Sequence, residues 1–189
     1  MSDLFPTICR AAEPARSPES AAAQVLVVGV GNTLMRDDGI GIEAVEALAS
    51  GFEIPPSVRI IDGGIAGPAW LAELGAVDHL WIVDAVRRGG TPGGFAWLTL
   101  DDLLERRGPI LSPHQVGVTE FLGMARILGR LPEDTRILGV EPLATTPCGL
   151  GLSDALRLAL PDVVCELVGE LSRLRVAMPR KRPIPASPT

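Results

Sequence analysis

The sequence predicts an α/β protein: a single domain of three layers, α/β/α, built around a mostly parallel twisted sheet of about five strands. Short apolar runs rich in valine alternate with stretches of helical periodicity, which is the pattern of βαβ units. The length of the chain, 189 residues, also fits one domain rather than two.

Both ends of the chain depart from this pattern. Residues 1–24 are rich in Ala, Pro, Ser and Glu without apolar periodicity, and residues 179–189 contain four prolines. Such segments cannot bury enough apolar surface to fold. We therefore expect a flexible N-terminal extension at 1–24, one folded domain at 25–178 and a flexible proline-rich tail at 179–189.

Five apolar runs predict the strands in chain order. The first is continuously apolar, which is typical of a strand covered on both faces. Glycines or an aspartate stand beside the later runs, where the chain can turn. The predicted strands are 24–31, 57–62, 78–86, 93–100 and 135–142.

Helical periodicity separates and follows these runs. One helix follows Gly39 and stops at Gly51, a proline opens a short helix at 68–74, and a third opens after His114. Pro161 should break or restart the last helix. The three apolar faces are Ile40, Ala44, Val45 and Leu48; Val118, Phe121, Leu122, Ala125 and Leu128; and Val164, Leu167, Val168, Leu171 and Leu174.

Composition excludes several functions. The net charge of −6 makes nucleic acid a poor partner, because phosphate contacts need clustered Lys and Arg. No apolar stretch is long enough to span a membrane. Three widely spaced cysteines without CxxC, and the lack of a secretory signal, indicate a cytoplasmic protein. Cys165 falls on an apolar helix face, where we expect a free buried thiol.

Polar residues at the carboxyl ends of the strands are the candidate functional residues, because parallel sheets bind ligands outside that edge. Three groups satisfy this condition: the loop 29–41 with Asp37 and Asp38, Asp84 at the end of an apolar run, and His114 in Ser-Pro-His-Gln. His79 begins a strand, so we expect it to be structural.

Each candidate also has a structural interpretation. The loop resembles the start of a dinucleotide fingerprint, but Leu34 replaces the third glycine and two aspartates oppose a phosphate. Asp37 is expected to cap the next helix. Asp84 is either an acceptor of loop N–H groups or a ligand, and His114 either points to solvent or joins the site.

Taken together, Asp38, Asp84 and His114 are compatible with a divalent metal site. Carboxylate oxygen suits many cations, and imidazole shifts the preference toward zinc, nickel and other transition metals. The sequence contains no HExxH and no GxSxG, which excludes a zincin helix and a serine nucleophile elbow.

Five segments resemble the hydrogenase maturation proteases, in the same order along the chain. They are VLVVGVGNTLMRDDGIGIEAVEAL (25–48), IIDGGIAGPAWLAEL (60–74), DHLWIVDAV (78–86), SPHQVGVTEFL (112–122) and RILGVEP (136–142). These proteases are endopeptidases that trim the C-terminal extension of the [NiFe]-hydrogenase large subunit. The resemblance covers about residues 24–175 and makes 25–178 a peptidase domain.

The resemblance implies a nickel-guided endopeptidase whose partner is the nickel-loaded large-subunit precursor. Asp38, Asp84 and His114 would be the catalytic and nickel-contacting residues. Nickel would be supplied by the substrate, and other divalent transition metals could occupy the same ligands. Residues expected to contact the substrate are Asn32, Asp62, Gly63, Gly64 and Gln115.

The resemblance leaves the chemical step open. The metal polarises a carbonyl or activates water, or it only positions the bond while Asp38 or Asp84 acts as general base. Two other functions use the same features: a non-catalytic metallochaperone or binding module for the nickel-loaded precursor, and a nucleotide-binding α/β domain.

Overall fold

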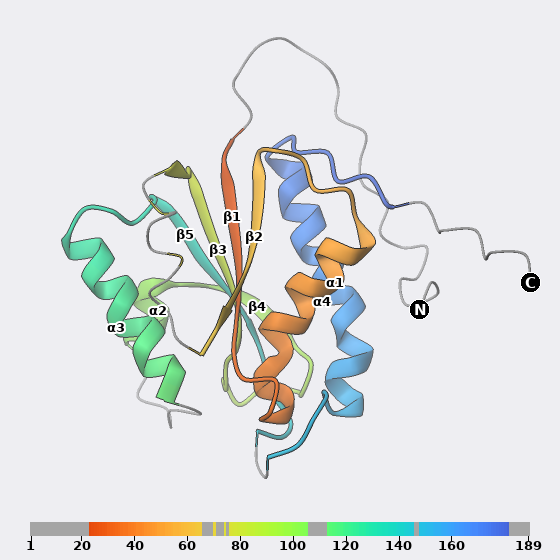
Figure 1. The fold of residues 1–189 in the computed structure, drawn as a ribbon. Helices are drawn as coiled ribbons and strands as arrows, with labels where there is room; N and C mark the ends of the chain where they lie inside the picture. Colours follow the sequence, from red (N-terminus) through yellow and green to blue (C-terminus); the bar gives the residue numbers. More distant parts are fainter. Residues whose placement is uncertain are drawn as a thin grey trace, which may run out of the picture.

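A five-stranded sheet forms the centre of the protein (Figure 1). The computed structural model describes residues 23–65, 70, 74, 76–105, 113–145 and 148–181, without the side chains of 113–117. Four strands are parallel and β4 runs antiparallel to β5, in the order β2-β1-β3-β5-β4. The strands are β1 (Val25–Val30), β2 (Val58–Gly64), β3 (His79–Ala85), β4 (Phe95–Thr99) and β5 (Asp134–Val140).

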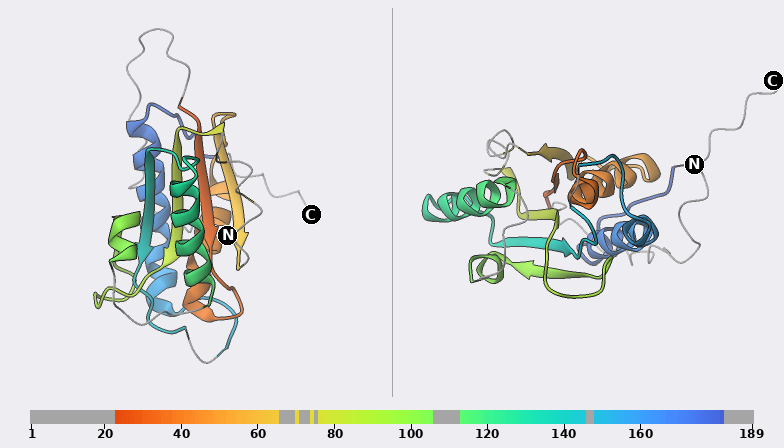
Figure 2. Two further views of the ribbon diagram at one scale, coloured as in Figure 1. Left: turned by 90° about the vertical axis from the view of Figure 1, so that its left-hand side faces the viewer. Right: turned by 90° about the horizontal axis from the view of Figure 1, so that it is seen from below.

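Helices cover both faces of this sheet, as Figures 1 and 2 show. The elements α1 (Ile40–Gly51) and α4 (Asp154–Arg173) pack on one face, and α3 (Pro113–Ile127) packs on the other. Two short elements complete the described fold, the 3-10 helix η1 (Arg36–Gly39) and α2 (Leu100–Leu104). The predicted three-layer α/β/α class is therefore confirmed.

Strand β3 shows how the two layers of core arise from one strand. Trp81 and Val83 belong to the cluster between the sheet and the α1–α4 layer, whereas Leu80 and Ile82 belong to the cluster beneath α3. Successive side chains of a strand point to opposite faces. A continuously apolar strand is therefore required wherever both faces are covered.

Helix α4 runs without a break through Pro161, so the expected interruption is wrong. Pro161 is buried, and its neighbours Leu160, Val163 and Val164 pack into the core. A proline inside a helix costs about 3 kcal/mol. Burying one large apolar side chain contributes about 1.5–3 kcal/mol, so the packed face outweighs the missing hydrogen bond.

Two further helix predictions need correction. Leu128 was expected on the buried face of α3, but it lies beyond the end of that helix and is 64% exposed. Helix α2 was not expected, although Thr99 and Asp102 form a capping box at its start. The short helix predicted at 68–74 lies mostly outside the described residues. The two described residues of this range, Trp70 and Leu74, are buried.

Residues 179–181, just past the expected domain boundary at 178, contact the end of α1. The N–H of Glu53 donates to the carbonyl of Pro179 (2.7 Å), and the N–H of Lys181 donates to that of Gly51 (3.0 Å). These bonds attach residues 179–181 to the end of α1. The expected extension at 1–22 and tail at 182–189 lie outside the described residues.

The cysteines differ from the expectation. Cys165 is half-buried and disulfide-bonded, so the prediction of a free buried thiol is wrong. Cys148 is free and exposed. In the described part of the chain, no helix has the length and apolar character needed to cross a membrane.

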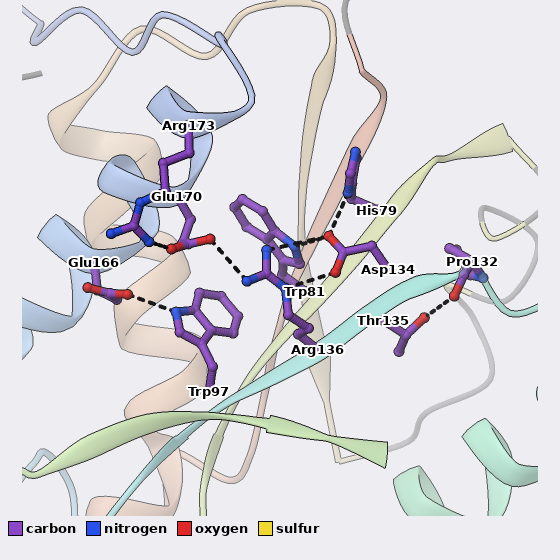
Figure 3. A network of polar contacts seen from close by, with 10 residues as sticks. All are labelled: His79, Trp81, Trp97, Pro132, Asp134, Thr135, Arg136, Glu166, Glu170 and Arg173. Atoms are coloured by element: carbon purple, nitrogen blue, oxygen red, sulfur yellow. Dashed lines mark hydrogen bonds and ion pairs between the residues drawn. The ribbon is translucent and has the colours of Figure 1, made fainter. Parts of the chain in front are cut away.

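A hydrogen bond between His79 and Asp134 joins β3 and β5 at the amino edge of the sheet, shown in Figure 3. His79 Nδ1 lies 2.6 Å from Asp134 Oδ2, and the two residues are register partners in the adjacent strands. The indole N–H of Trp81 also donates to Asp134 Oδ2 (3.4 Å). The prediction that His79 is structural is therefore confirmed.

Arg136 lies at the centre of the same network. Its guanidinium carbon is 5.2 Å from the ring centre of Trp81 and 4.7 Å from that of Trp97. Its nitrogens pair with Asp134 (2.9 Å) and with Glu170 of α4 (3.0 Å). A half-buried cation thus connects the sheet to α4, far from the carboxyl edge.

Candidate active site

The carboxyl ends of β1 and β3 meet the first turn of α1 at one edge of the sheet, the lower edge in Figure 1. This junction depends on Gly41. A Cβ atom there would overlap the carbonyl oxygens of Val30 and Val83, at the ends of the two strands. Because only glycine allows this approach, η1 is held beside the end of β3.

Asp38 lies in η1 with 1% of its surface exposed. Its Oδ2 accepts the backbone N–H of Asn32 (3.1 Å). The turn between them is tight, because Gly31 has a φ of +139° and a Cβ there would overlap the Asp38 carbonyl oxygen. This hydrogen bond attaches the Asp38 carboxylate to the turn that follows β1.

Asp84 is 5% exposed and is the penultimate residue of β3. By strand alternation it shares a face with Leu80 and Ile82, which pack on the α3 side of the sheet. The N-terminal end of α3 lies at the same edge (Figure 1). His114 belongs to the first turn of α3, and its side chain lies outside the described residues.

The neighbouring Asp37 has a structural role, but not the predicted one. The N-cap of α1 is Gly39, which makes no side-chain capping bond. The fully buried carboxylate of Asp37 instead accepts the N–H groups of Leu143 (2.9 Å), Ala144 (2.8 Å) and Ser153 (2.6 Å), and the Ser153 hydroxyl (2.9 Å). Asp37 therefore fixes η1 to the segment that precedes α4.

Glu141 is a buried carboxylate that the sequence reasoning missed. It follows β5, is 4% exposed, and accepts N–H groups from Arg88 (2.6 Å), Gly89 (3.3 Å) and Gly90 (3.1 Å). It thereby fixes the loop that follows Asp84. A signal was present, because Glu141 ends an apolar run at the carboxyl edge just as Asp84 does.

The predicted substrate contacts begin on the neighbouring strand. Asp62 of β2 is the register partner of Gly29, and its Oδ1 accepts the N–H of Gly64 (2.8 Å). Gly64 has a φ of +53°, and a Cβ at Gly63 would lie 2.8 Å from a methyl group of Val28. These contacts define a tight, exposed end of β2 at the carboxyl edge.

The other two predicted contacts flank the carboxylates. Asn32 accepts the N–H of Leu34 on its side-chain oxygen (3.0 Å), so the amide is fixed within the β1–η1 turn. Gln115 lies in the first turn of α3, and its side chain is outside the described residues.

The carboxylate oxygens described at this edge are chemically suited to bind a divalent cation. Among side chains that the structure describes, no three of the types His, Cys, Asp and Glu group closely enough to hold a metal ion. The imidazole of His114, the third predicted ligand, is not among them. Asp38 and Asp84 supply hard carboxylate oxygen, which many divalent cations accept.

Known proteins share this architecture and sequence. The sequence model of a family described as "Hydrogenase maturation protease" matches residues 42–170. The chain is 33% identical over 160 residues to the hydrogenase 2 maturation protease of Escherichia coli K12, covering 84% of this chain and 97% of that one. It is also 33% identical to the hydrogenase expression/formation protein HupD of Rhodobacter capsulatus, over 84% of this chain and 74% of that protein.

The comparison with solved structures indicates the same family. The structure of the hydrogenase maturating endopeptidase HybD from E. coli superimposes with a TM-score of 0.75 at 30% identity, covering 84% of this chain and 98% of that chain. The matches in sequence and in fold span most of both chains. This chain therefore belongs to the hydrogenase maturation protease family, and it is an endopeptidase.

Proposed function

We propose that this endopeptidase is guided by nickel and removes the C-terminal extension of a [NiFe]-hydrogenase large-subunit precursor, as a late step after metal insertion. One observation carries the proposal: two buried carboxylates, Asp38 and Asp84, come from separate segments to one edge of the sheet. The first turn of α3, with His114, belongs to the same edge.

Nickel enters this proposal as part of the substrate. Asp38, Asp84 and His114 would bind the nickel that the precursor already holds, and other divalent transition metals could take the same ligands. Two carboxylates and one imidazole suit borderline cations of this kind. Binding through the metal would bring one peptide bond beside the carboxylates, and such positioning lowers the barrier of the following step.

The reaction is hydrolysis of that peptide bond. A water oxygen attacks the carbonyl carbon, the C–N bond breaks, and the leaving nitrogen takes up a proton. Asp38 or Asp84 would accept the proton of the attacking water as general base. When bound, the metal would polarise the scissile carbonyl or only position it.

The end of β2 and the β1–η1 turn would form the walls of the substrate cleft. Asn32, Asp62, Gly63 and Gly64 lie on these segments, and Gln115 follows His114 on α3. Tight turns favour close approach of a peptide backbone. We propose that the enzyme works in the cytoplasm, where it would meet the precursor before assembly. The disulfide bond of Cys165 removes the cysteine argument for a reducing compartment, so this proposal rests on the location of the precursor.

A processing assay tests the proposal. The purified chain is incubated with nickel-loaded precursor, and the mass of the large subunit is followed by mass spectrometry. We expect a shorter large subunit and a released C-terminal peptide. A stable complex without any loss of mass would instead show a metallochaperone or binding module, and saturable tight binding of a nucleotide would support the third function.

A further inference from the structure

Arg36, at the start of η1, has an unusual backbone and an unusual side chain. Its φ of +53° lies in the left-handed region, which residues with a Cβ rarely adopt. Its backbone N–H donates to the carbonyl of Gly149 (3.0 Å), and the N–H of Gly149 donates to that of Leu34 (2.9 Å). The two loops together therefore fix this strained conformation beside Asp38.

The guanidinium of Arg36 has no anion of its own in the described part of the chain. Its Nε is buried without a hydrogen-bond partner, while the residue as a whole is half-buried. The neighbouring Asp37 is already saturated by Leu143, Ala144 and Ser153. In a chain with a net charge of −6, an arginine held this way without a carboxylate is unexpected.

The Arg36 side chain is also positioned by its contact with Gly149. A Cβ on Gly149 would lie 3.0 Å from Arg36 Nε and 3.4 Å from its Cζ, so the stem and the guanidinium lie across this glycine. The terminal amino groups are not among the buried unpartnered atoms. They therefore remain available to a ligand, and an arginine fork matches a carboxylate in two parallel hydrogen bonds.

The surface around Arg36 is suited to a peptide. Leu34 and Leu150, on the two loops that hold the arginine, are 60% and 81% exposed. These side chains are available to pack against an apolar residue of a bound peptide while Arg36 binds a carboxylate. Asp38 is only two residues from Arg36, so a peptide bound here would continue toward the carboxylates.

We propose that Arg36 is a specificity-determining residue, which binds a carboxylate of the substrate protein close to the bond that is cut. This inference rests on the proposed proteolysis of the large-subunit precursor. The carboxylate is either an Asp or Glu side chain beside the scissile bond or the terminal carboxylate of the C-terminal extension.

The first test compares Arg36→Gly, Arg36→Lys and Arg175→Gly in steady-state processing of nickel-loaded precursor. Arg175 is the matched control, because it is an exposed arginine with a φ of +61° at the end of α4. We expect Arg36→Gly to raise KM by about tenfold to a hundredfold with little change in kcat. The KM of Arg36→Lys should lie between those of the wild type and Arg36→Gly. The KM of Arg175→Gly should match that of the wild type.

The fold of the variant is checked separately. Glycine tolerates the left-handed conformation, so Arg36→Gly should unfold at the wild-type temperature or above it. A lower unfolding temperature together with unchanged KM would overturn the proposal, because Arg36 would then serve only the loop structure.

A binding measurement keeps this inference separate from the proposed function. In the wild-type background at early times, before most of the precursor is cleaved, precursor should slow alkylation of the exposed Cys148 next to Gly149, with the modification read at Cys148 by mass spectrometry. Adding Arg36→Gly should abolish this protection. Protection without any cleavage by the wild type would refute the proteolysis while supporting Arg36, and equal protection with and without Arg36 would refute this inference.

Two precursor variants identify the carboxylate. One replaces the Asp and Glu residues beside the scissile bond with Asn and Gln, and the other moves the terminal carboxylate away by adding residues to the C-terminus. The variant that removes the KM difference between wild type and Arg36→Gly contains the partner of Arg36. If the difference persists with both variants, Arg36 binds no substrate carboxylate and the proposal is wrong.

Discussion

Asp37 and Asp38 are adjacent in sequence but have different surroundings. Asp37 accepts four hydrogen bonds from residues more than a hundred positions later in the chain. Asp38 accepts the N–H of Asn32 from the turn just before it and lies beside the end of β3. The sequence predicted a structural role for Asp37 and a functional role for Asp38, but it assigned Asp37 the wrong contacts, because the partners of Asp37 are determined by the tertiary fold.

This division predicts different results for the same substitution at neighbouring positions. Asp37→Asn should lower the free energy of unfolding by about 2–4 kcal/mol, because an amide offers one acceptor oxygen to several buried donors. Asp38→Asn should unfold near the wild-type midpoint but abolish processing of the precursor. Urea unfolding and the mass of the large subunit measure the two effects.

Binding separates the two roles open to Asp38. If Asp38→Asn still binds nickel-loaded precursor without cutting it, the general-base role is favoured over the ligand role. Processing at the wild-type rate by this variant would remove Asp38 from the site altogether.

At the scale of elements, the approach of α1 to the sheet positions the site. Gly41→Ala would place a Cβ against the carbonyl oxygens of Val30 and Val83, so α1 must move away from the strand ends. We expect lower stability and loss of processing. Gly123→Ala in α3 is the control: a Cβ there has open space, so the helix should gain about 0.5–1 kcal/mol. Equal effects of both substitutions would contradict the role of Gly41.

The hydrogen bonds of Glu141 predict that its substitution loosens the loop after β3. In Glu141→Gln, the N–H groups of Arg88, Gly89 and Gly90 lose a charged acceptor. We expect faster amide hydrogen exchange at these three residues and a loss of about 1–3 kcal/mol in unfolding free energy. Unchanged exchange in this loop, with general destabilisation elsewhere, would show that Glu141 does not hold it.

Sequence periodicity located the strands within a few residues, because strands covered on both faces have a continuous apolar signal. It failed where packing outweighs local preference. Pro161 lies inside an unbroken α4 because the apolar face around it is buried. Leu128 continued the helical spacing of α3 but lies beyond the last turn, since spacing alone does not mark the end of a helix.

At the scale of the whole molecule, Asp134 links stability to pH. Burial would raise its pKa, but hydrogen bonds from His79 and Trp81 and the charge of Arg136 outweigh burial and lower the pKa below the ordinary 3.8. A carboxyl whose pKa is lower in the folded state stabilises the fold above the unfolded-state pKa. That contribution is lost as the pH falls through the folded-state pKa.

Asp134→Asn should therefore lower the unfolding free energy by about 1–2 kcal/mol at neutral pH, a value reduced by partial exposure of the carboxylate. Measured in urea from neutral pH to about pH 3, the difference from wild type should shrink with acidification. Asp154→Asn is the control, because that side chain is 94% exposed, and it should have little effect. A difference independent of pH would contradict the assigned network.

The sheet topology explains why part of the site could be predicted from the sequence. In a parallel sheet the strand ends that follow Val30 and Val83 meet at one edge, so a position rule selects Asp38 and Asp84 from many acidic residues. The same rule applied to β5 would have found Glu141. The unusual side chain of Arg36 could not be predicted, because its backbone conformation and its contact with Gly149 exist only in the folded chain.

Nickel in the precursor directs the cut in the proposed function, and a comparison of two precursor forms is the sharpest test of this role. Wild-type enzyme is incubated with the same precursor in nickel-loaded and nickel-free form, and the shortened large subunit is quantified over time by mass spectrometry. We expect cleavage of the nickel-loaded form and an intact nickel-free form. Cleavage of both forms at the same rate would contradict nickel guidance through Asp38, Asp84 and His114.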